Sequence, residues 1–129
     1  MISRYAQTPA TQTPWGPAPS AMEIAPGIVN FRTESHGGAH VDLSERMTWP
    51  APLREFQTFA GENWYEEDCD FHIVILARPD AFPIEHVRHA VNFAREYCKT
   101  YAPAVSKWID SDERRAVKIR AMLGEPVPA

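Results

Sequence analysis

The sequence predicts an α+β domain, in which a small N-terminal antiparallel β-hairpin or sheet packs on a C-terminal set of about three α-helices. Residues that favour strands and turns gather between positions 22 and 43. After Pro83, apolar residues recur at three- and four-residue spacing, as they do on one face of a helix. The chain has 129 residues, of which 44% are hydrophobic, enough for one modest core. We therefore expect residues 13–124 to form a single domain.

The two ends of the chain carry little apolar periodicity. The first twenty residues are rich in Ser, Thr and Pro, so we expect residues 1–12 to form a flexible N-terminal arm that a partner would order. Trp15 stands between two prolines, and burial of its indole would pin the extended segment to the domain, whereas ligand stacking is the less favoured role. Residues 125–129 would form a frayed tail.

A β-hairpin is predicted between residues 28 and 43. Residues 28–33 are strand formers, and residues 39–43 alternate between apolar and polar side chains. The segment between them contains Gly37 and Gly38, which adopt positive φ without strain. The pattern therefore predicts a hairpin centred on these two glycines.

The middle of the chain gives mixed signals. Pro50 and Pro52 interrupt residues 44–59, which indicates a loop with one helical turn around residues 53–56. Asn63 and Glu66 have the spacing of a helix-capping box, which favours a helix from there to about residue 77. The β-branched residues at positions 73–75 favour a strand instead. We predict the helix.

The C-terminal part predicts two further helices. The first begins after Pro83 and ends before Pro103, which cannot continue it. The second spans residues 111–123, with Ser111 as its cap and Gly124 as its stop. The first helix would bury one apolar stripe made of Ile84, Val87, Val91, Ala94, Cys98 and Tyr101.

Charge and composition exclude several classes of protein. The net charge is −4, whereas proteins that coat nucleic acid carry a basic surplus, so we expect no general nucleic-acid binding. No apolar run approaches the length that spans a bilayer, and the N-terminus lacks a signal-peptide core. Cys69 and Cys98 are consistent with free thiols in a reducing compartment. We expect a cytoplasmic protein without membrane contact.

The first candidate site is His36, which precedes the two glycines. Imidazole can act as a general base near neutral pH, and loops on a rigid frame often carry functional residues. The alternative is a turn histidine that forms only local hydrogen bonds. The sequence does not decide between them.

The second candidate is the segment Trp64-Tyr65-Glu66-Glu67-Asp68. Neighbouring carboxylates can bind a cation or hold one raised pKa, but acidic residues also stabilise the first turn of a helix. On such a helix Glu66 and Asp70 would share a face. Exposed Trp64 and Tyr65 would serve as anchors for a protein partner, because aromatic residues dominate interface energetics.

Other potential ligands and charges favour structural interpretations. Zinc ligands come in short pairs and no Cys-x-x-Cys is present, so we expect neither a metal nor a cofactor. No phosphate-binding glycine loop or nucleophile elbow is present either. We expect the members of the possible zinc set to be buried thiols and solvated histidines; the set is His36, His40, Cys69, His72 and Cys98. We expect a second set to lie on solvated helix surfaces; it is His86, Arg88, His89, Arg114, Arg115, Lys118 and Arg120.

Four sequence blocks occur in one order along the chain: Thr13-Pro14-Trp15-Gly16-Pro17-Ala18, Ile24-Ala25-Pro26-Gly27-Ile28, Ser35-His36-Gly37-Gly38 and Trp64-Tyr65-Glu66-Glu67-Asp68-Cys69-Asp70-Phe71. Together they resemble an uncharacterised domain family encoded in phages, plasmids and integrated mobile elements of proteobacteria. The resemblance covers residues 13–76 and implies no catalytic roles. It implies a setting in which small acidic proteins often act by occluding a host protein, such as a nuclease or other defence machinery.

The leading hypothesis is therefore a protein-interaction module that binds a basic protein surface, with inhibition of host defence as one form of this function. It implies no oligomeric state. Its binding residues would be Ser35, His36, Gly37, Gly38, Trp64, Tyr65, Glu66 and Glu67. The alternative is a small hydrolase or transferase, with His36 as general base and with Glu66, Glu67 or Asp68 orienting it or holding a cation. A structural or assembly protein of the element is the third hypothesis.

Overall fold

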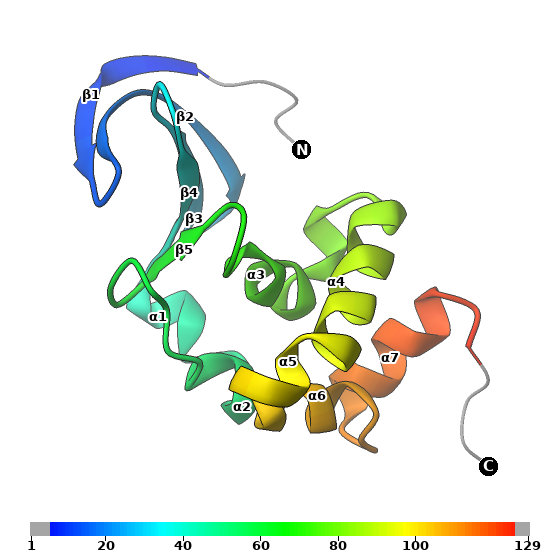
Figure 1. The fold of residues 1–129 in the computed structure, drawn as a ribbon. Helices are drawn as coiled ribbons and strands as arrows, with labels where there is room; N and C mark the ends of the chain where they lie inside the picture. Colours follow the sequence, from blue (N-terminus) through cyan, green and yellow to red (C-terminus); the bar gives the residue numbers. More distant parts are fainter. Residues whose placement is uncertain (1–5, 126–129) are drawn as a thin grey trace. The chain divides into compact units, whose positions relative to one another are not determined.

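A computed structural model describes residues 6–125 and has the predicted α+β architecture, with five antiparallel strands ahead of most of the helices (Figure 1). The described residues divide into two compact units. The first comprises residues 6–49 and 57–74, and the second comprises residues 50–56 and 75–125. The candidate site residues all belong to the first unit.

The first unit is built on a curled five-stranded sheet whose spatial order follows the chain, β1-β2-β3-β4-β5 (Figure 1). Each strand pairs antiparallel with the next one. The strands are β1 (Ala6–Thr13), β2 (Gly16–Ala25), β3 (Ile28–Arg32), β4 (Gly37–Val41) and β5 (Trp64–Glu66). Its fully buried apolar residues are Ala18, Ile28, Ala39, Val41 and Tyr65.

Strand β1 lies where the sequence predicted a flexible arm. Its residues 6, 7 and 11–13 pair with β2, with a shift of register between Gln7 and Thr11. At the turn the Thr13 hydroxyl donates a hydrogen bond of 2.7 Å to the Gly16 carbonyl. Gly16 has a φ of +108°, which favours glycine at this turn. We did not predict this strand, because its polar and proline residues lack the alternation of apolar and polar side chains that indicates a strand. Residues 1–5 lie outside the described residues, and flexibility of the arm stays a prediction.

The predicted hairpin is confirmed as β3–β4, but Gly37 and Gly38 do not form its turn. The turn is residues 33–36, and both glycines lie in β4 without positive φ. A Cβ on Gly37 would stand 2.7 Å from the carbonyl oxygen of Phe31, and one on Gly38 would overlap the Trp15 ring and the backbone of β5. The glycines therefore supply space for close approach, not conformational freedom.

Two single-turn helices follow the sheet's fourth strand. Helix α1 (Leu43–Arg46) begins at a residue that we expected to end the strand, and helix α2 (Ala51–Arg54) corresponds to the one predicted turn, two residues earlier than expected. Pro50 precedes α2 and Pro52 lies in its first turn, where a missing N–H is tolerated.

The predicted helix from Asn63 is wrong in its first part. Residues 64–66 form β5, and Asn63 has a φ of +70°, which is incompatible with the capping geometry we expected. Tyr65 is fully buried while its two neighbours are partly exposed, the two-residue alternation of a strand. Pairing with β4 outweighs the local capping signal. The helical prediction is confirmed only over α3 (Phe71–Ala77), which contains the β-branched residues.

The second unit consists largely of helices. Besides α2 and the last residues of α3, they are η1 (Pro79–Ala81), a 3₁₀ turn, α4 (Ile84–Glu96), α5 (Cys98–Tyr101), α6 (Pro103–Ile109) and α7 (Arg114–Met122). The predicted helix after Pro83 is α4 together with α5, and four residues of its stripe are buried: Val87, Val91, Ala94 and Cys98. Helix α6 was not predicted, because we interpreted Pro103 only as the end of the preceding helix. Pro103 in fact lies in the first turn of a new helix, where proline is tolerated.

The last helix starts three residues later than predicted. Its cap is Glu113, whose carboxylate accepts hydrogen bonds from the N–H groups of Arg115 and Ala116. Ser111 instead donates to the Trp108 carbonyl at 2.7 Å, before the helix begins. No helix within residues 6–125 is both long enough and apolar enough to cross a membrane.

The C-terminal end of the described chain is held by ion pairs. Arg95 donates two hydrogen bonds to Glu125, of 2.7 and 2.6 Å, and two to Asp110, of 3.0 and 2.8 Å. Glu125, which we expected in a frayed tail, is therefore tied to α4. Residues 126–129 lie outside the described residues.

Candidate functional site

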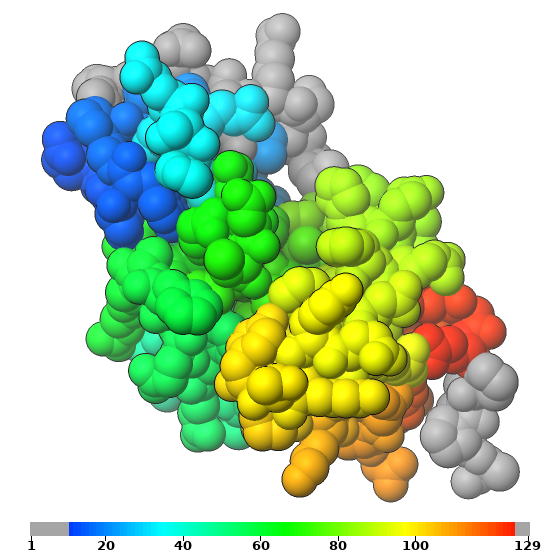
Figure 2. Space-filling model, in the orientation of Figure 1, coloured from blue at the N-terminus to red at the C-terminus, as the bar shows by residue number. Residues whose placement is uncertain are grey.

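The loop between β3 and β4 presents His36 to solvent. Thr33 closes this loop, since its N–H and its hydroxyl both donate to the His36 carbonyl, at 2.8 and 2.6 Å. The same hydroxyl accepts a hydrogen bond of 3.0 Å from the His36 N–H. The backbone of His36 is thereby fixed while its side chain is exposed. The loop and the segment after β5 both reach the face drawn in Figure 2.

The segment after β5 is fixed in a similar way. The Glu67 N–H donates to the Gly37 carbonyl at 3.0 Å, which continues the β4–β5 pairing by one residue. The Asp68 N–H donates to a carboxylate oxygen of Glu66 at 2.9 Å, and the Asp70 N–H donates to the Glu66 carbonyl at 3.0 Å. Local turn bonds and strand pairing therefore place Glu66, Glu67 and Asp68.

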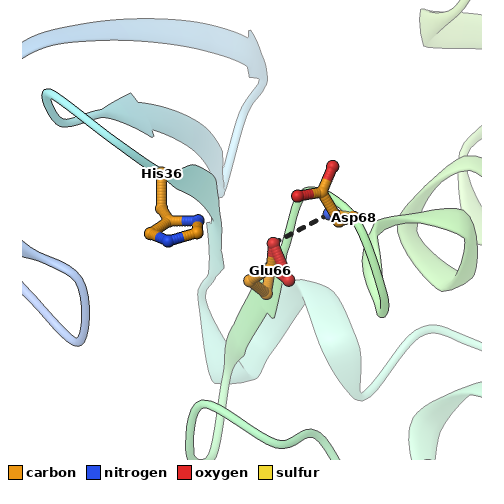
Figure 3. A group of neighbouring side chains, drawn as sticks. All are labelled: His36, Glu66 and Asp68. Carbon is orange, nitrogen blue, oxygen red and sulfur yellow. Dashed lines mark hydrogen bonds between the residues drawn. The ribbon is translucent and has the colours of Figure 1, made fainter.

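The structure brings His36 together with two of the predicted acidic residues. A ring nitrogen of His36 and one carboxylate oxygen each of Glu66 and Asp68 all lie within 4.8 Å of one another (Figure 3). The histidine precedes β4 and the acids end or follow β5, so the antiparallel pairing of those strands creates the group. In the described part of the chain, neither a hydrogen bond nor an ion pair joins the His36 ring to these carboxylates.

Five of the predicted site residues remain on an accessible surface, which we call the loop patch. Four of its members are exposed and Glu66 is half-buried. Gly37 and Gly38, also predicted as binding residues, are buried in the sheet and contribute backbone only. The loop patch consists of Ser35, His36, Glu66, Glu67 and Asp68.

Tyr65 does not belong to this surface, contrary to the prediction of an exposed anchor. Its side chain is 0% exposed, with the ring centroid 5.8 Å from that of Trp49. Burial raises the pKa of its hydroxyl, and the nearby Arg46 partly offsets this. The error follows from the helix prediction, because a strand directs Tyr65 and its two neighbours to opposite faces.

Trp64 is half-buried in an aromatic cluster of the first unit. Its ring centroid lies 5.7 Å from Trp15 in an edge-to-face arrangement, 5.8 Å from Phe31 and 4.7 Å from His40. The predicted role of Trp15 as a packing anchor fits this contact. Trp64 thus supports the sheet beside the loop patch, and only part of its ring is available to a partner.

The remaining groups near the patch have distinct environments. Cys69 is an exposed free thiol, and its hydrogen bond with Glu66 raises its pKa, so it stays protonated at neutral pH. Asp70 is buried and accepts a hydrogen bond of 3.0 Å from the Phe59 N–H; burial raises the pKa of this carboxyl. The predicted helical face shared by Glu66 and Asp70 does not exist, because Glu66 ends a strand.

The possible zinc set does not assemble among the described residues. Of its five members, only His36 belongs to the group of potential ligands within residues 6–125. Cys98 and His72 are buried. His86, Arg88 and His89 are exposed on α4, as predicted. Arg120, which we expected on a solvated helix face, is instead buried and donates a hydrogen bond to the Ile109 carbonyl.

Sequence reasoning missed Thr33, which fixes the loop. The signal was available, since a threonine three residues before His36 has the spacing of a side-chain-closed turn. It was overlooked because we assigned the reversal to the glycines.

The comparison with protein families is decisive for classification. A family model described as a domain of unknown function, DUF7007, matches residues 8–125. The chain belongs to this family. The match spans both units of the DUF7007 domain and extends well beyond the residues 13–76 on which the resemblance rested. It confirms an uncharacterised domain family, while the origin in phages or mobile elements stays a prediction.

The other two comparisons add no relatives. No curated protein and no solved structure matches this DUF7007 domain.

Proposed function

We propose that this DUF7007 domain is a protein-interaction module that binds a basic surface of its partner through the loop patch. The observation that carries the proposal is the run of carboxylates at Glu66, Glu67 and Asp68 beside the exposed His36. Among the described residues, no lysine or arginine forms an ion pair with this run. Carboxylates without an internal cation are available to the cations of a partner.

Electrostatic matching of this kind raises association rates and selects partners of opposite charge. The fixed backbones of the loop and of the segment after β5 reduce the conformational entropy lost on binding. The half-buried Trp64 offers limited apolar area beside the charges. These features support recognition of charge and shape more than insertion of an aromatic anchor.

The setting that we propose for this function is a phage or mobile element of a proteobacterium, with a cytoplasmic host-defence protein as the partner. Its support is the resemblance of the four sequence blocks, together with the acidic net charge of −4. Occlusion of a basic, nucleic-acid-binding surface is the inhibitory action that such charges favour.

The test is a patch variant carrying Glu66→Gln, Glu67→Gln and Asp68→Asn. Proteins captured from a bacterial lysate by the wild-type domain are first identified, and their dissociation constants are then measured with purified material at two salt concentrations. We expect the patch variant to bind at least about tenfold more weakly, and wild-type binding to weaken as salt rises.

A matched control neutralises three exposed carboxylates of the second unit, Glu85, Glu96 and Asp112. This control should bind within about threefold of wild type. If the patch variant keeps every partner at wild-type affinity, or the control loses as much as the patch variant, the proposed surface is wrong.

A small hydrolase or transferase is the second candidate, favoured by the convergence of His36 with Glu66 and Asp68 within 4.8 Å. His36 would act as general base, and a carboxylate would orient it once substrate is bound. His36→Ala should then abolish turnover in a screen of ester and phosphoester substrates, with His89→Ala as the control. Activity that persists in His36→Ala would contradict this mechanism.

A further inference from the structure

His36, Glu66 and Asp68 offer the donor set of a divalent-cation site. Imidazole nitrogen and carboxylate oxygens bind zinc at about 2.0–2.2 Å in a tetrahedral arrangement, so two ligands of one ion lie roughly 3.4 Å apart. The three donor atoms already lie within 4.8 Å of one another. Side-chain rotations that move each donor by about 1 Å would bring all three to one ion. Figure 3 shows the three side chains, which come from the loop before β4 and from the end of β5 and the segment after it.

The backbones that carry these donors are fixed independently of any ion. Thr33 holds His36 through three hydrogen bonds, and the Glu67–Gly37 bond keeps the two segments side by side. Ligands on such frames need only rotamer changes in order to bind, so little backbone entropy is lost.

The Glu66 carboxylate is also oriented. One of its oxygens accepts the hydrogen bond of 2.9 Å from the Asp68 N–H, which restrains the carboxylate as outer hydrogen bonds restrain the ligands of known metal sites. Glu67, which is exposed and adjacent, adds a further negative charge without pairing to a lysine or arginine among the described residues. The electrostatics therefore favour a cation at this place.

The mixture of donors indicates the class of ion. Mg²⁺ and Ca²⁺ prefer all-oxygen ligands, whereas imidazole suits zinc and its neighbours among the transition metals. Three protein ligands on an exposed surface leave at least one coordination position for water or for a partner's side chain.

We propose that His36, Glu66 and Asp68 form a site for one divalent transition-metal ion of the zinc class. This inference goes beyond the proposed function, which needs no metal. It also has a consequence for that function: an ion bound here neutralises two carboxylates of the loop patch and weakens attraction to a basic partner, unless the partner supplies a ligand to the same ion.

The experiment is a titration of the full chain with Zn²⁺ by calorimetry, after treatment with a chelator, with Mg²⁺ as a comparison ion. We expect one Zn²⁺ per chain and at least about tenfold weaker binding of Mg²⁺. His36→Ala and Asp68→Asn should each weaken Zn²⁺ binding at least about tenfold, since loss of even an outer partner of a ligand has an effect of that size.

His89→Ala is the matched control, because His89 is an exposed histidine on α4, outside the group. It should bind Zn²⁺ as wild type does. Circular dichroism of each variant checks that the fold is retained, which the exposure of His36 and Asp68 leads us to expect. NMR of the wild-type domain gives a second readout, since Zn²⁺ should shift the His36 ring resonances and leave those of His89 in place.

Several results would overturn the assignment. They are absence of Zn²⁺ binding, unchanged affinity in His36→Ala, equal losses in His36→Ala and His89→Ala, and binding that depends on Cys69 but not on His36. The outcome is separable from the proposed function, because the metal titration contains no partner and partner binding is measured in the presence of chelator.

Discussion

Replacement of Gly38 by alanine is the sharpest test of how the sheet is packed. Gly38 pairs with Phe31 of β3 and with Glu66 of β5. An added Cβ would overlap the Trp15 ring and the Tyr65 carbonyl oxygen and would stand 3.0 Å from the Glu66 Cα. Two of these three neighbours are backbone atoms, which cannot rotate away as a side chain can.

The size of the effect follows from what has to move. Overpacking in a well-packed interior destabilises by about 1–3 kcal/mol when side chains can adjust. Here β5 itself must shift by a few tenths of an ångström or more, together with the aromatic cluster. We therefore expect a loss at the upper end, about 3 kcal/mol, and a thermal midpoint lower by roughly 10 °C for a chain of this size.

The assay is urea unfolding followed by far-ultraviolet circular dichroism, with Gly124→Ala as the control. Gly124 has a φ of +78° and open space around it. Its replacement by alanine should therefore lower the free energy of unfolding only through the strained backbone conformation, by about 1 kcal/mol. If Gly38→Ala proves no more destabilising than Gly124→Ala, the close approach of β4, β5 and the Trp15 ring does not constrain position 38 and our explanation of this glycine fails.

Three further predictions concern the helical unit and the aromatic cluster. Glu113→Ala removes the acceptor of two N–H groups at the start of α7 and should lower the free energy of unfolding by about 1 kcal/mol, measured in urea; an unchanged value would show that the cap is not formed. The hydrogen bond from Arg95 holds the pKa of Glu125 below its ordinary value. The ion pair therefore stabilises the fold fully at pH values above the pKa of a free glutamate, and this stabilisation is lost as the pH falls through the lowered pKa of Glu125. Glu125→Gln should therefore destabilise by at most about 1 kcal/mol at pH 7 and by nothing in acid, and a difference that persists in acid would contradict this ion pair as its cause. Trp15→Ala loses the edge-to-face contact with Trp64 and should destabilise by about 2 kcal/mol, less than for a fully buried tryptophan, with a shift in tryptophan fluorescence as the second readout.

The fold class and the longest helix were predictable because their signals are local. The apolar stripe after Pro83 repeats over several turns, and no other element has to be known in order to interpret it. Strand β5 was not predictable in this way, because the spacing of Asn63 and Glu66 is that of a helix cap. The competing stabilisation comes from pairing with β4, which is more than twenty residues away in the sequence. Local propensity is overridden by such pairing.

The candidate site was predictable in its residue types but not in its geometry. His36 and the acids at 66–68 were recognisable as functional groups on a loop and in an acidic run. Their convergence depends on the register that sets Gly38 opposite Glu66, and a shift by one residue would direct the neighbouring side chains to the other face. The same register buries Tyr65, which explains why an expected contact residue became part of the core.

The spacing of the strands along the chain also has a consequence for the order in which the first unit assembles. Strands β1 to β4 are joined by short turns, so each can pair as soon as its predecessor is formed, whereas β5 must close a loop of more than twenty residues. Longer loops have a larger closure entropy and non-local pairs form more slowly. We therefore expect β5 to dock last, both in refolding and on the ribosome. His36 comes close to Glu66 and Asp68 only at that step. A ligand that binds all three residues would therefore stabilise the sheet only after β5 has paired with β4.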